Sequence, residues 1–249
     1  MSISWLTPQW PAPPSVRALS TFRSGGVSAI PYASLNLAAH VGDESDAVDA
    51  NRRRLMSAAS LPAEPAWLSQ VHGAHVADLD AGLPSGGADA AFTRQAGRVC
   101  AILAADCLPI LLAAASGGVV AAVHAGWRGL AAGVIEAAVG ALAPKPEELL
   151  AWLGPAIGPE HFEVGAEVRE ALLRADPGSG AAFAPNARGR FMADLPTLAR
   201  RRLAALGLTR IYDSAECTYS QPDRYFSYRR DGKCGRQATL IWLQQAQNR

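Results

Sequence analysis

The sequence predicts a mixed α/β fold in a single domain, residues 1–249, built around a largely buried mixed sheet. Hydrophobic residues make up 49% of the 249-residue chain, which is enough for one large core. Apolar runs typical of strands alternate irregularly with amphipathic helical segments, which indicates some antiparallel pairing. Two apolar runs joined by a Gly-containing turn, 99–115 and 119–123, predict a β-hairpin buried on both faces.

The part of the chain before this hairpin predicts a strand and a helix. Residues 16–22 can form a strand that ends at a Gly-containing turn. Residues 46–59 predict a helix, because Val48, Leu55 and Met56 would share one side of it. A polar, Gly-containing loop follows before the hairpin.

The hairpin itself is interrupted at Pro109. Because proline has no amide to donate, Pro109 indicates a strand end, a bulge or an edge. After the return strand, Gly126 and Gly129 lead into an Ala-rich helix with an apolar stripe over 130–142. The rest of the chain predicts helices at 164–173 and 195–206 and strands at 152–157, 211–217 and 238–243.

The composition excludes several classes of partner. The formal net charge is +1, so nothing indicates binding to nucleic acid or another polyanion. No uninterrupted apolar stretch reaches the length of a transmembrane helix, and the N-terminus lacks the pattern of a signal peptide, so we expect a cytoplasmic protein that does not interact with membranes. The widely spaced cysteines predict free thiols or a metal ligand; they are Cys100, Cys107, Cys217 and Cys234.

Three residues predict a metal site: His72, Cys107 and His124. Two imidazoles and a thiolate suit zinc, with copper as the alternative metal. Three protein ligands without an obvious fourth are typical of catalytic zinc sites, where water or substrate takes the remaining position. Asp106 is a candidate for orienting a ligand or moving a proton, since carboxylates commonly orient metal-bound histidines.

The segment after His124 predicts an anion site. A helix that begins at a Gly-rich turn offers free amides at its N-terminus, and Arg128 adds a positive charge. A metal beside such a pocket points to a phosphorylated substrate or to inorganic phosphate as co-substrate. The cluster 224–230 predicts either an ordered surface loop or a loop that binds a base or a phosphate, which makes Arg230 a candidate substrate contact.

Simpler interpretations apply to the same residues. A buried cysteine in an apolar strand is usually a small hydrophobic side chain, and a histidine before a Gly-rich turn is often a structural donor. The segment His161-Phe162-Glu163 resembles half of a zinc deaminase motif, but the second half is absent. No H-E-x-x-H, P-loop, G-x-G-x-x-G or G-x-S-x-G motif occurs.

Taken together, the motifs resemble the family named for a laccase-like domain, for polyphenol oxidoreductase activity and for peptidoglycan editing. The resemblance covers nearly the whole chain and includes Gln70-Val71-His72-Gly73, Ala105-Asp106-Cys107 and the segment His124-Ala125-Gly126-Trp127-Arg128-Gly129. Other shared segments are 21–28, 34–37, 41–43, 51–52, 154–158 and 226–232. One departure is Cys234, where the family pattern leads us to expect Thr before Gly-Arg.

The resemblance implies an α/β sandwich similar to the cysteine-hydrolase-like fold of deamidating toxins, with a metal bound by the residues matching His72, Cys107 and His124. It also implies a purine nucleoside phosphorylase acting on adenosine, inosine and methylthioadenosine, with adenosine deaminase activity. A multicopper oxidase is a poor fit, because five scattered histidines cannot ligate several coppers.

The implied phosphorylase activity suggests roles for further residues. Phosphate would be held by Arg23, by Arg128 or by the amides after Gly126. Gln70 and Asn36 are candidates for hydrogen bonds to the nucleoside. We expect a monomer or a small homo-oligomer.

Two other functions remain open from the sequence. Cys107 and His124 could form the nucleophile and base of a metal-free amidase acting on peptidoglycan precursors. Alternatively, a non-catalytic binding protein could be stabilised by zinc, with His75 or Cys217 as fourth ligand.

Overall fold

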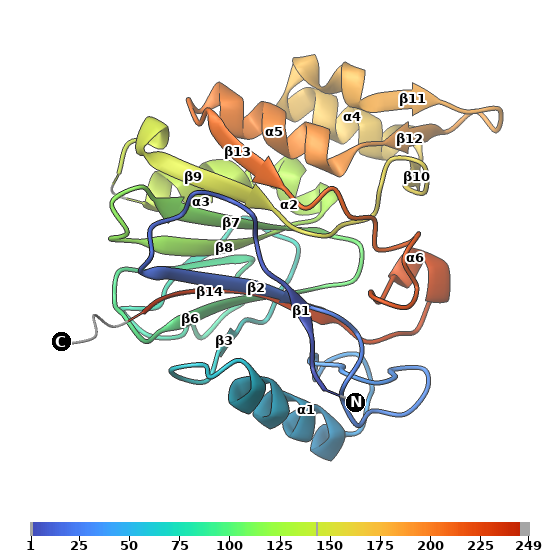
Figure 1. The fold of residues 1–249 in the computed structure, drawn as a ribbon. Helices are drawn as coiled ribbons and strands as arrows, with labels where there is room; N and C mark the ends of the chain where they lie inside the picture. The colour runs from blue at the N-terminus through green and yellow to red at the C-terminus, as the bar shows by residue number, and fades with distance from the viewer. Residues whose placement is uncertain (1, 143, 245–249) are drawn as a thin grey trace.

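Two β-sheets pack against each other in the middle of the protein, and helices cover their outer faces (Figure 1). The computed structural model describes residues 2–142 and 144–244. Apolar side chains from both sheets meet between them, including Ile102 and Ile241 from one sheet and Leu111 from the other. This confirms the predicted mixed α/β sandwich. Among the described residues, no helix has the length and apolar character needed to cross a membrane.

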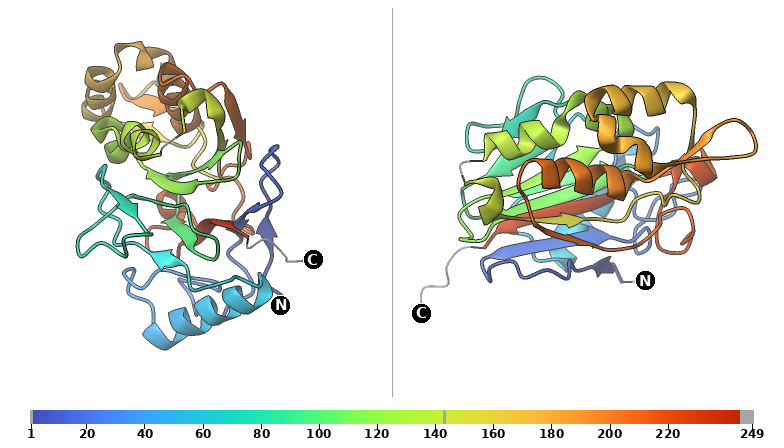
Figure 2. Two further views of the ribbon diagram at one scale, coloured as in Figure 1. Left: turned by 90° about the vertical axis from the view of Figure 1, so that its left-hand side faces the viewer. Right: turned by 90° about the horizontal axis from the view of Figure 1, so that it is seen from above.

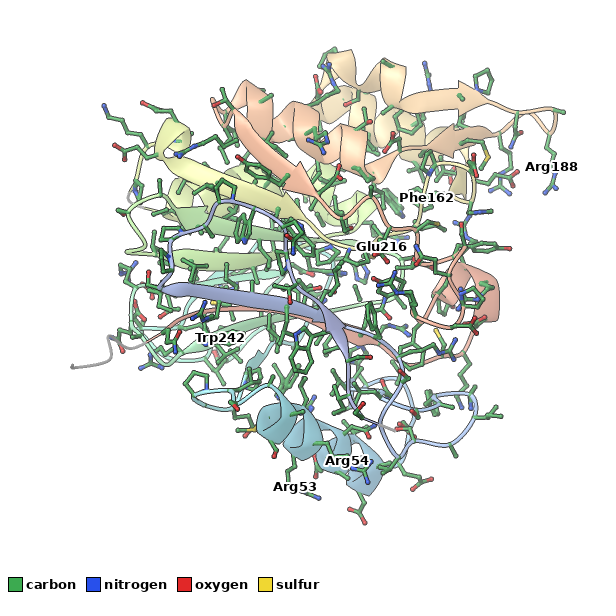
Figure 3. All side chains as sticks on the ribbon, in the orientation of Figure 1. Arg53, Arg54, Phe162, Arg188, Glu216 and Trp242 are labelled. Carbon is green, nitrogen blue, oxygen red and sulfur yellow. The ribbon has the colours of Figure 1, made fainter. Side chains whose placement is uncertain are left out.

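The first sheet has the strand order β1-β2-β14-β6-β3. Its strands are β1 Trp5–Leu6, β2 Val16–Thr21, β3 Ala66–Trp67, β6 Val99–Ala104 and β14 Gln237–Leu243. Helix α1, Ser45–Ala58, covers the outer face, where Val48 and Leu55 are buried and Met56 is half-buried. Figure 3 shows Trp242 of β14 on this side of the sheet, and Arg53 on the outward side of α1.

The second sheet has the order β13-β9-β7-β8-β5-β4. Its strands are β4 Val76–Asp78, β5 Ala90–Thr93, β7 Leu108–Ala114, β8 Val120–Ala125, β9 Leu149–Leu153 and β13 Arg210–Asp213. Helices cover its outer face (Figure 2): α2 Trp127–Ala132, α3 Val134–Ala141, α4 Ala166–Ala175 and α5 Leu195–Ala205. The remaining elements are a small sheet of β10 Glu163–Val164, β11 Phe183–Pro185 and β12 Phe191–Ala193, the 3-10 turns Pro146–Glu148 and Pro177–Ala182, and the short helix α6 Tyr228–Asp231.

The predicted first hairpin strand, 99–115, is wrong as one element. It consists of β6 in the first sheet and β7 in the second, and the chain crosses between the sheets at 105–107, where Asp106 has φ 89°. Both strands are buried along their whole length, so hydrophobicity does not mark the crossing. The hairpin itself is confirmed for β7 and β8, and Pro109 lies near the start of β7, opposite His124.

The predicted helix 130–142 is divided in two. Gly133 lies between α2 and α3 with φ 85°, a conformation that glycine adopts without a Cβ clash. Helix α5 is confirmed within one residue of its predicted ends, whereas β9 and β13 end four residues before the predicted strand ends. All four cysteines are free thiols, as predicted.

Candidate metal and active site

His72, Cys107 and His124 come together at one end of the sandwich. His72 follows β3, Cys107 ends the crossing before β7, and His124 lies on β8, which pairs with β7. The Cys107 Sγ is 3.8 Å from the His72 Nε2, and the two imidazole centroids are 4.8 Å apart. One potential ligand atom from each residue lies within 4.8 Å of the others, the only such group of three His, Cys, Asp or Glu residues in the described parts of the chain.

The unbroken β7–β8 register explains why Cys107 and His124 meet. Leu108 pairs with Ala125, so the preceding Cys107 lies beside Gly126 at the end of the hairpin. Of the three alternatives predicted for Pro109, the structure shows the strand end, and no bulge is needed to bring Cys107 and His124 together. A Cβ on Gly126 would lie 2.9 Å from the Cys107 Sγ and 3.2 Å from the His72 Cδ2, so only glycine leaves this space to the three side chains.

Asp89 organises both histidines. Its carboxylate is fully buried and accepts a hydrogen bond from the His124 Nδ1 at 2.8 Å. The same carboxylate accepts from the backbone amides of Val71, His72 and Gly73 at 3.2, 2.9 and 2.7 Å. These bonds hold the turn in which His72 has φ 60°, a conformation that is strained for a residue with a side chain. The bond to Nδ1 leaves the Nε2 of His124 as the atom available to a ligand or proton.

The electrostatics of the cluster favour a thiolate. Burial raises the pKa of Cys107, but the charge and hydrogen bonds of His124 and the contact with His72 outweigh it and lower the pKa. Burial opposes charging of His124 too, yet Cys107 and Asp89 raise its pKa. For Asp89, the bonds from His124 and from the amides of Gly73 and His72 outweigh burial and lower its pKa. The thiolate is the form that attacks electrophiles and binds metals.

The donor set is one that binds zinc, with copper as the alternative. In a tetrahedral site with Zn–N near 2.0 Å and Zn–S near 2.3 Å, the ligand atoms would lie about 3.3–3.6 Å apart. The three atoms observed here lie within 4.8 Å of one another, so the side chains would have to move closer together to hold one ion. The Asp89–His124 bond is the carboxylate–histidine arrangement that accompanies zinc ligands.

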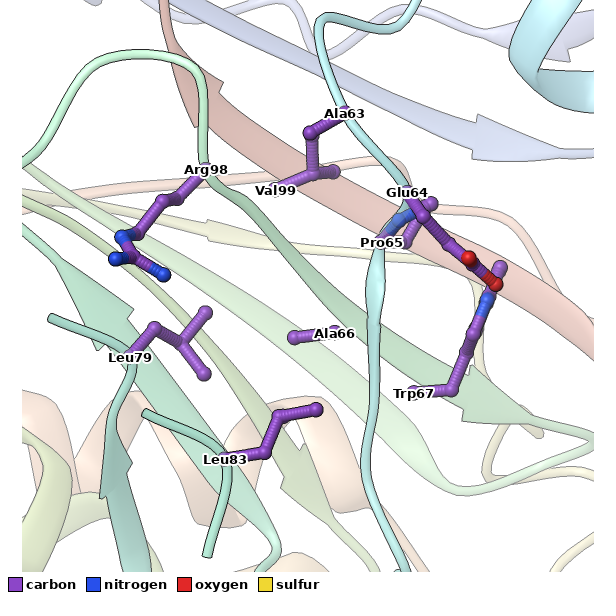
Figure 4. Close-up of a pocket in the computed structure, with 9 residues that line it drawn as sticks. All are labelled: Ala63, Glu64, Pro65, Ala66, Trp67, Leu79, Leu83, Arg98 and Val99. Atoms are coloured by element: carbon purple, nitrogen blue, oxygen red, sulfur yellow. The ribbon is translucent and has the colours of Figure 1, made fainter. Parts of the chain in front are cut away.

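Two cavities open onto the cluster and share His72, Ala105, Cys107 and Tyr228 as walls. The first, here called the Arg236 cavity, has a volume of about 410 Å³ and is completed by His40, Gln70, Leu103, Ala104, His124 and Arg236. The second, the Trp127 cavity, has a volume of about 280 Å³ and is completed by Asp106, Trp127, Arg128, Ile157, Phe162 and Arg229. A further cavity of about 400 Å³ lies beside β3 and shares no lining residue with the cluster (Figure 4).

Asp106 does not have the role expected for it. Its carboxylate accepts from the Thr218 Oγ1 at 2.6 Å and from the Arg229 amide at 2.7 Å, and it makes no hydrogen bond to His72 or His124. The expectation that it orients a metal ligand is therefore wrong, because Asp89 occupies that position. Asp106 instead ties the crossing between the sheets to α6.

The predicted substrate contacts divide into two groups. Arg128 lines the Trp127 cavity and stacks on the Trp127 ring at 4.3 Å. Gln70 lines the Arg236 cavity, but its amide group bonds the backbone N–H and C=O of Leu103, both at 2.8 Å. Gln70 thus also fixes the loop that carries His72 to β6.

The other predicted contacts face inward. Asn36 is fully buried and bonds only protein groups, so its expected contact with a nucleoside is wrong. Arg23 donates to the carbonyls of Ala33 and Pro222, and Arg230 donates to Asp231 and to the carbonyls of residues 218, 219 and 225. Neither arginine lines a cavity at the cluster.

The sequence did not single out Asp89 or Arg236, whereas Tyr228 belongs to the cluster 224–230 that it predicted as a possible binding loop. Asp89 ends a Gly-rich loop and carries no local motif, so its partners become visible only in the fold. Arg236 belongs to the Gly-Arg pair that the family resemblance already pointed to. The remaining anion candidate, the amides after Gly126, loses support because α2 has only six residues.

Comparison with known proteins shows the family of the chain. The model of the family described as multi-copper polyphenol oxidoreductase laccase matches residues 17–244. The chain belongs to this family. Purine nucleoside phosphorylase YfiH of Shigella flexneri is 53% identical over 240 residues, which cover 96% of this chain and 98% of the relative. Purine nucleoside phosphorylase PA4543 of Pseudomonas aeruginosa is 54% identical over 244 residues, covering 97% and 99%.

Solved structures show the same fold. Protein NMB0706 of Neisseria meningitidis superposes with a TM-score of 0.93 at 44% identity, covering 97% of this chain and 99% of that one. YlmD of Geobacillus stearothermophilus superposes with a TM-score of 0.90 at 33% identity, covering 97% and 96%. The fold described above is therefore shared with these solved structures.

Proposed function

We propose that this protein is a metal-dependent purine nucleoside phosphorylase that uses inorganic phosphate and acts on adenosine, inosine and methylthioadenosine. The observation that carries the proposal is the His72–Cys107–His124 cluster with two cavities that open onto it. The purine nucleoside phosphorylase names of the relatives support the reaction class. Zinc is the proposed metal and copper the alternative. Adenosine deamination is the proposed second activity.

In phosphorolysis a phosphate oxygen forms a bond to the anomeric carbon while the bond to the purine nitrogen breaks. The electron pair leaves with the base, which takes up the proton lost by the attacking hydrogen phosphate. The products are the free base and ribose 1-phosphate, or 5-methylthioribose 1-phosphate when the substrate is methylthioadenosine. A metal bound by the cluster would supply a Lewis acid next to the reacting centre. The Asp89 carboxylate bonds the His124 ring and the backbone amide of His72, so both imidazoles are positioned before substrate binds.

The Trp127 cavity suits the purine nucleoside. Trp127, Phe162 and Tyr228 offer aromatic faces for the planar base, and Arg128 adds a charged donor beside them. Asp106 fixes the start of α6, which carries Tyr228. We propose that Asp106 is a positioning residue here.

The test is a chromatographic assay of adenosine and inosine with and without phosphate, before and after chelation. Free base and ribose 1-phosphate should form only with phosphate, disappear after metal removal, and return when zinc is restored. His72→Ala should bind less metal and lose turnover. If no base forms under any of these conditions, the phosphorylase proposal is wrong.

One observation favours a second candidate, a metal-free cysteine hydrolase acting on peptidoglycan precursors. Cys107 and His124 belong to one cluster, Asp89 orients His124, and the pKa of Cys107 is lowered, which supplies a nucleophile, a base and an orienting carboxylate. Metal-free protein whose Cys107 reacts rapidly with iodoacetamide, and which cleaves a muropeptide amide, would support this candidate. Stoichiometric zinc that protects Cys107 would contradict it.

The third function, a binding protein with a structural zinc, is not favoured because neither candidate for the fourth ligand lies at the cluster. A closed zinc site needs a fourth ligand, and the two candidates are engaged elsewhere. The His75 Nδ1 bonds the Gly87 carbonyl oxygen, and the Cys217 Sγ accepts from the Gly158 amide. Neither belongs to the cluster.

A further inference from the structure

The guanidinium of Arg236 lines the Arg236 cavity and has donors available to an anion. The Arg236 Nη1 donates to the carbonyl oxygens of Cys234 at 2.8 Å and Gly235 at 2.9 Å, and it lies 3.6 Å from the Cys234 Sγ. The side chain is partly buried and lines the cavity beside His40. One nitrogen is thus tethered to the protein, while the Nε and Nη2 have no protein partner among the described residues.

The side chain of Asn36 fixes the backbone at Arg236. The Asn36 Oδ1 accepts from the Arg236 amide at 2.9 Å, across 200 positions of sequence. The Asn36 Nδ2 donates to the Asp43 Oδ2 at 2.9 Å and to the Ala38 carbonyl at 3.1 Å. Because Asn36 is completely buried, this support is part of the core. The position of Arg236 is therefore built into the fold.

Charge pairing distinguishes Arg236 from Arg224 and Arg230 of the C-terminal segment; among the described residues Arg229 is likewise without an ion pair, but its side chain is exposed, whereas that of Arg236 is partly buried. Arg230 is paired with Asp231, and Arg224 with Glu216. Within 2–142 and 144–244, no carboxylate lies within ion-pair distance of Arg236. A partly buried guanidinium without a counterion has a strong preference for an oxyanion, and its planar fork matches two phosphate oxygens.

The two cavities differ in the chemistry that they offer. The Trp127 cavity has aromatic walls and two exposed arginines: Arg128 lies over the Trp127 ring, and the Arg229 Nη1 donates to the Glu163 carbonyl oxygen. The Arg236 cavity has a tethered guanidinium and the imidazole of His40. Both end at the metal cluster. In-line displacement needs the nucleophile and the leaving base on different sides of the anomeric carbon, and two cavities that meet at one centre provide separate sites for them.

We propose that Arg236 is the phosphate-binding residue, so that inorganic phosphate occupies the Arg236 cavity and the purine nucleoside the Trp127 cavity. This inference rests on the proposed phosphorylase function. It differs from the sequence-based expectation, in which Arg23 or Arg128 held the phosphate. Arg236 binds the phosphate dianion through its Nε and Nη2, and Asn36 acts as a positioning residue behind it.

The experiment compares Arg236→Met with the matched variant Arg128→Met, both loaded with zinc and checked for metal content. Losing a charge-assisted bidentate contact should raise the KM for phosphate in Arg236→Met by about 10- to 100-fold, while the KM for inosine stays within about threefold. Calorimetric titration with inorganic phosphate alone should show the same weakening without turnover. Arg128→Met should keep the KM for phosphate within about threefold.

Two further variants secure the result. Arg236→Lys retains the positive charge but not the planar fork of donors, so its KM for phosphate should lie between those of wild type and Arg236→Met. This variant also provides the test if the methionine variant does not fold. Cys234→Thr introduces the residue expected from the family pattern, and its hydroxyl can accept the same Nη1 bond, so the KM for phosphate should not change.

The proposal is overturned if the KM and the calorimetric Kd for phosphate are unchanged in Arg236→Met and Arg236→Lys, or if Arg128→Met alone raises them. A wild type that forms no free base under any condition refutes the phosphorylase function. Phosphate titration of wild type and Arg236→Met then still decides whether Arg236 binds the anion.

Discussion

Replacing Asp89 by Asn tests whether one carboxylate organises both histidines of the site. The substitution keeps the size and shape of the side chain but turns one acceptor oxygen into an NH₂ donor. Asp89 Oδ1 accepts from the His72 amide and the His124 Nδ1, and Oδ2 accepts from the amides of Val71 and Gly73. Whichever oxygen is replaced, two donors lose their acceptor.

The magnitude follows from those two lost bonds. A buried donor left without a partner costs about 1–3 kcal/mol. Because the three amides are only part-buried and can be reached by water, we expect the free energy of unfolding to fall by about 2–4 kcal/mol. Metal affinity should fall by about 10- to 100-fold, since His124 loses its orienting partner or the turn of His72 relaxes.

The assay is a competition titration of zinc against a chromophoric chelator, combined with urea unfolding of the metal-free protein. Asp106→Asn is the matched control, because Asp106 bonds Thr218 and the Arg229 amide but neither histidine. Its zinc affinity should remain within about threefold of wild type. Asp89→Asn with wild-type zinc affinity, or Asp106→Asn with the larger loss, would refute the reasoning.

Three further outcomes are expected. Gly126→Ala should fold but bind zinc about tenfold more weakly or worse, because its Cβ would lie 2.9 Å from the Cys107 Sγ; full affinity in the same chelator competition would contradict this. Arg202→Met removes the ion pair to Glu136, whose second carboxylate oxygen is buried without a partner although the side chain as a whole is partly exposed, and should lower the free energy of unfolding in urea by about 1–2 kcal/mol. Arg202→Met/Glu136→Leu should recover part of that loss, and no recovery would argue against a buried-charge effect. Chelation should lower the thermal midpoint, by the equivalent of about 2.7 kcal/mol relative to protein with free zinc at 100 times the Kd, and an unchanged midpoint would count against a bound metal.

The sequence was sufficient for elements whose stabilising contacts are local or periodic. The β7–β8 hairpin follows from two apolar runs around a turn, and α5 follows from its amphipathic period. The sequence did not reveal that 99–115 is divided between two sheets, because strands buried on both faces have the same hydrophobicity in either sheet. The break at Gly133 depends on how two short helices pack on the second sheet, which one glycine in an Ala-rich segment does not reveal.

For the site, the residue types by themselves predicted a metal site: two imidazoles and a thiol in unusual local settings pointed to His72, Cys107 and His124, which the structure brings together. Only the tertiary structure decided which groups support them. Asp89 replaced Asp106 as the orienting carboxylate, and Asn36 became the support of Arg236. The physical reason is that a hydrogen bond requires its partners within about 3 Å. The fold brings together Asn36 and Arg236, which are 200 positions apart, and no local pattern in the chain encodes their contact.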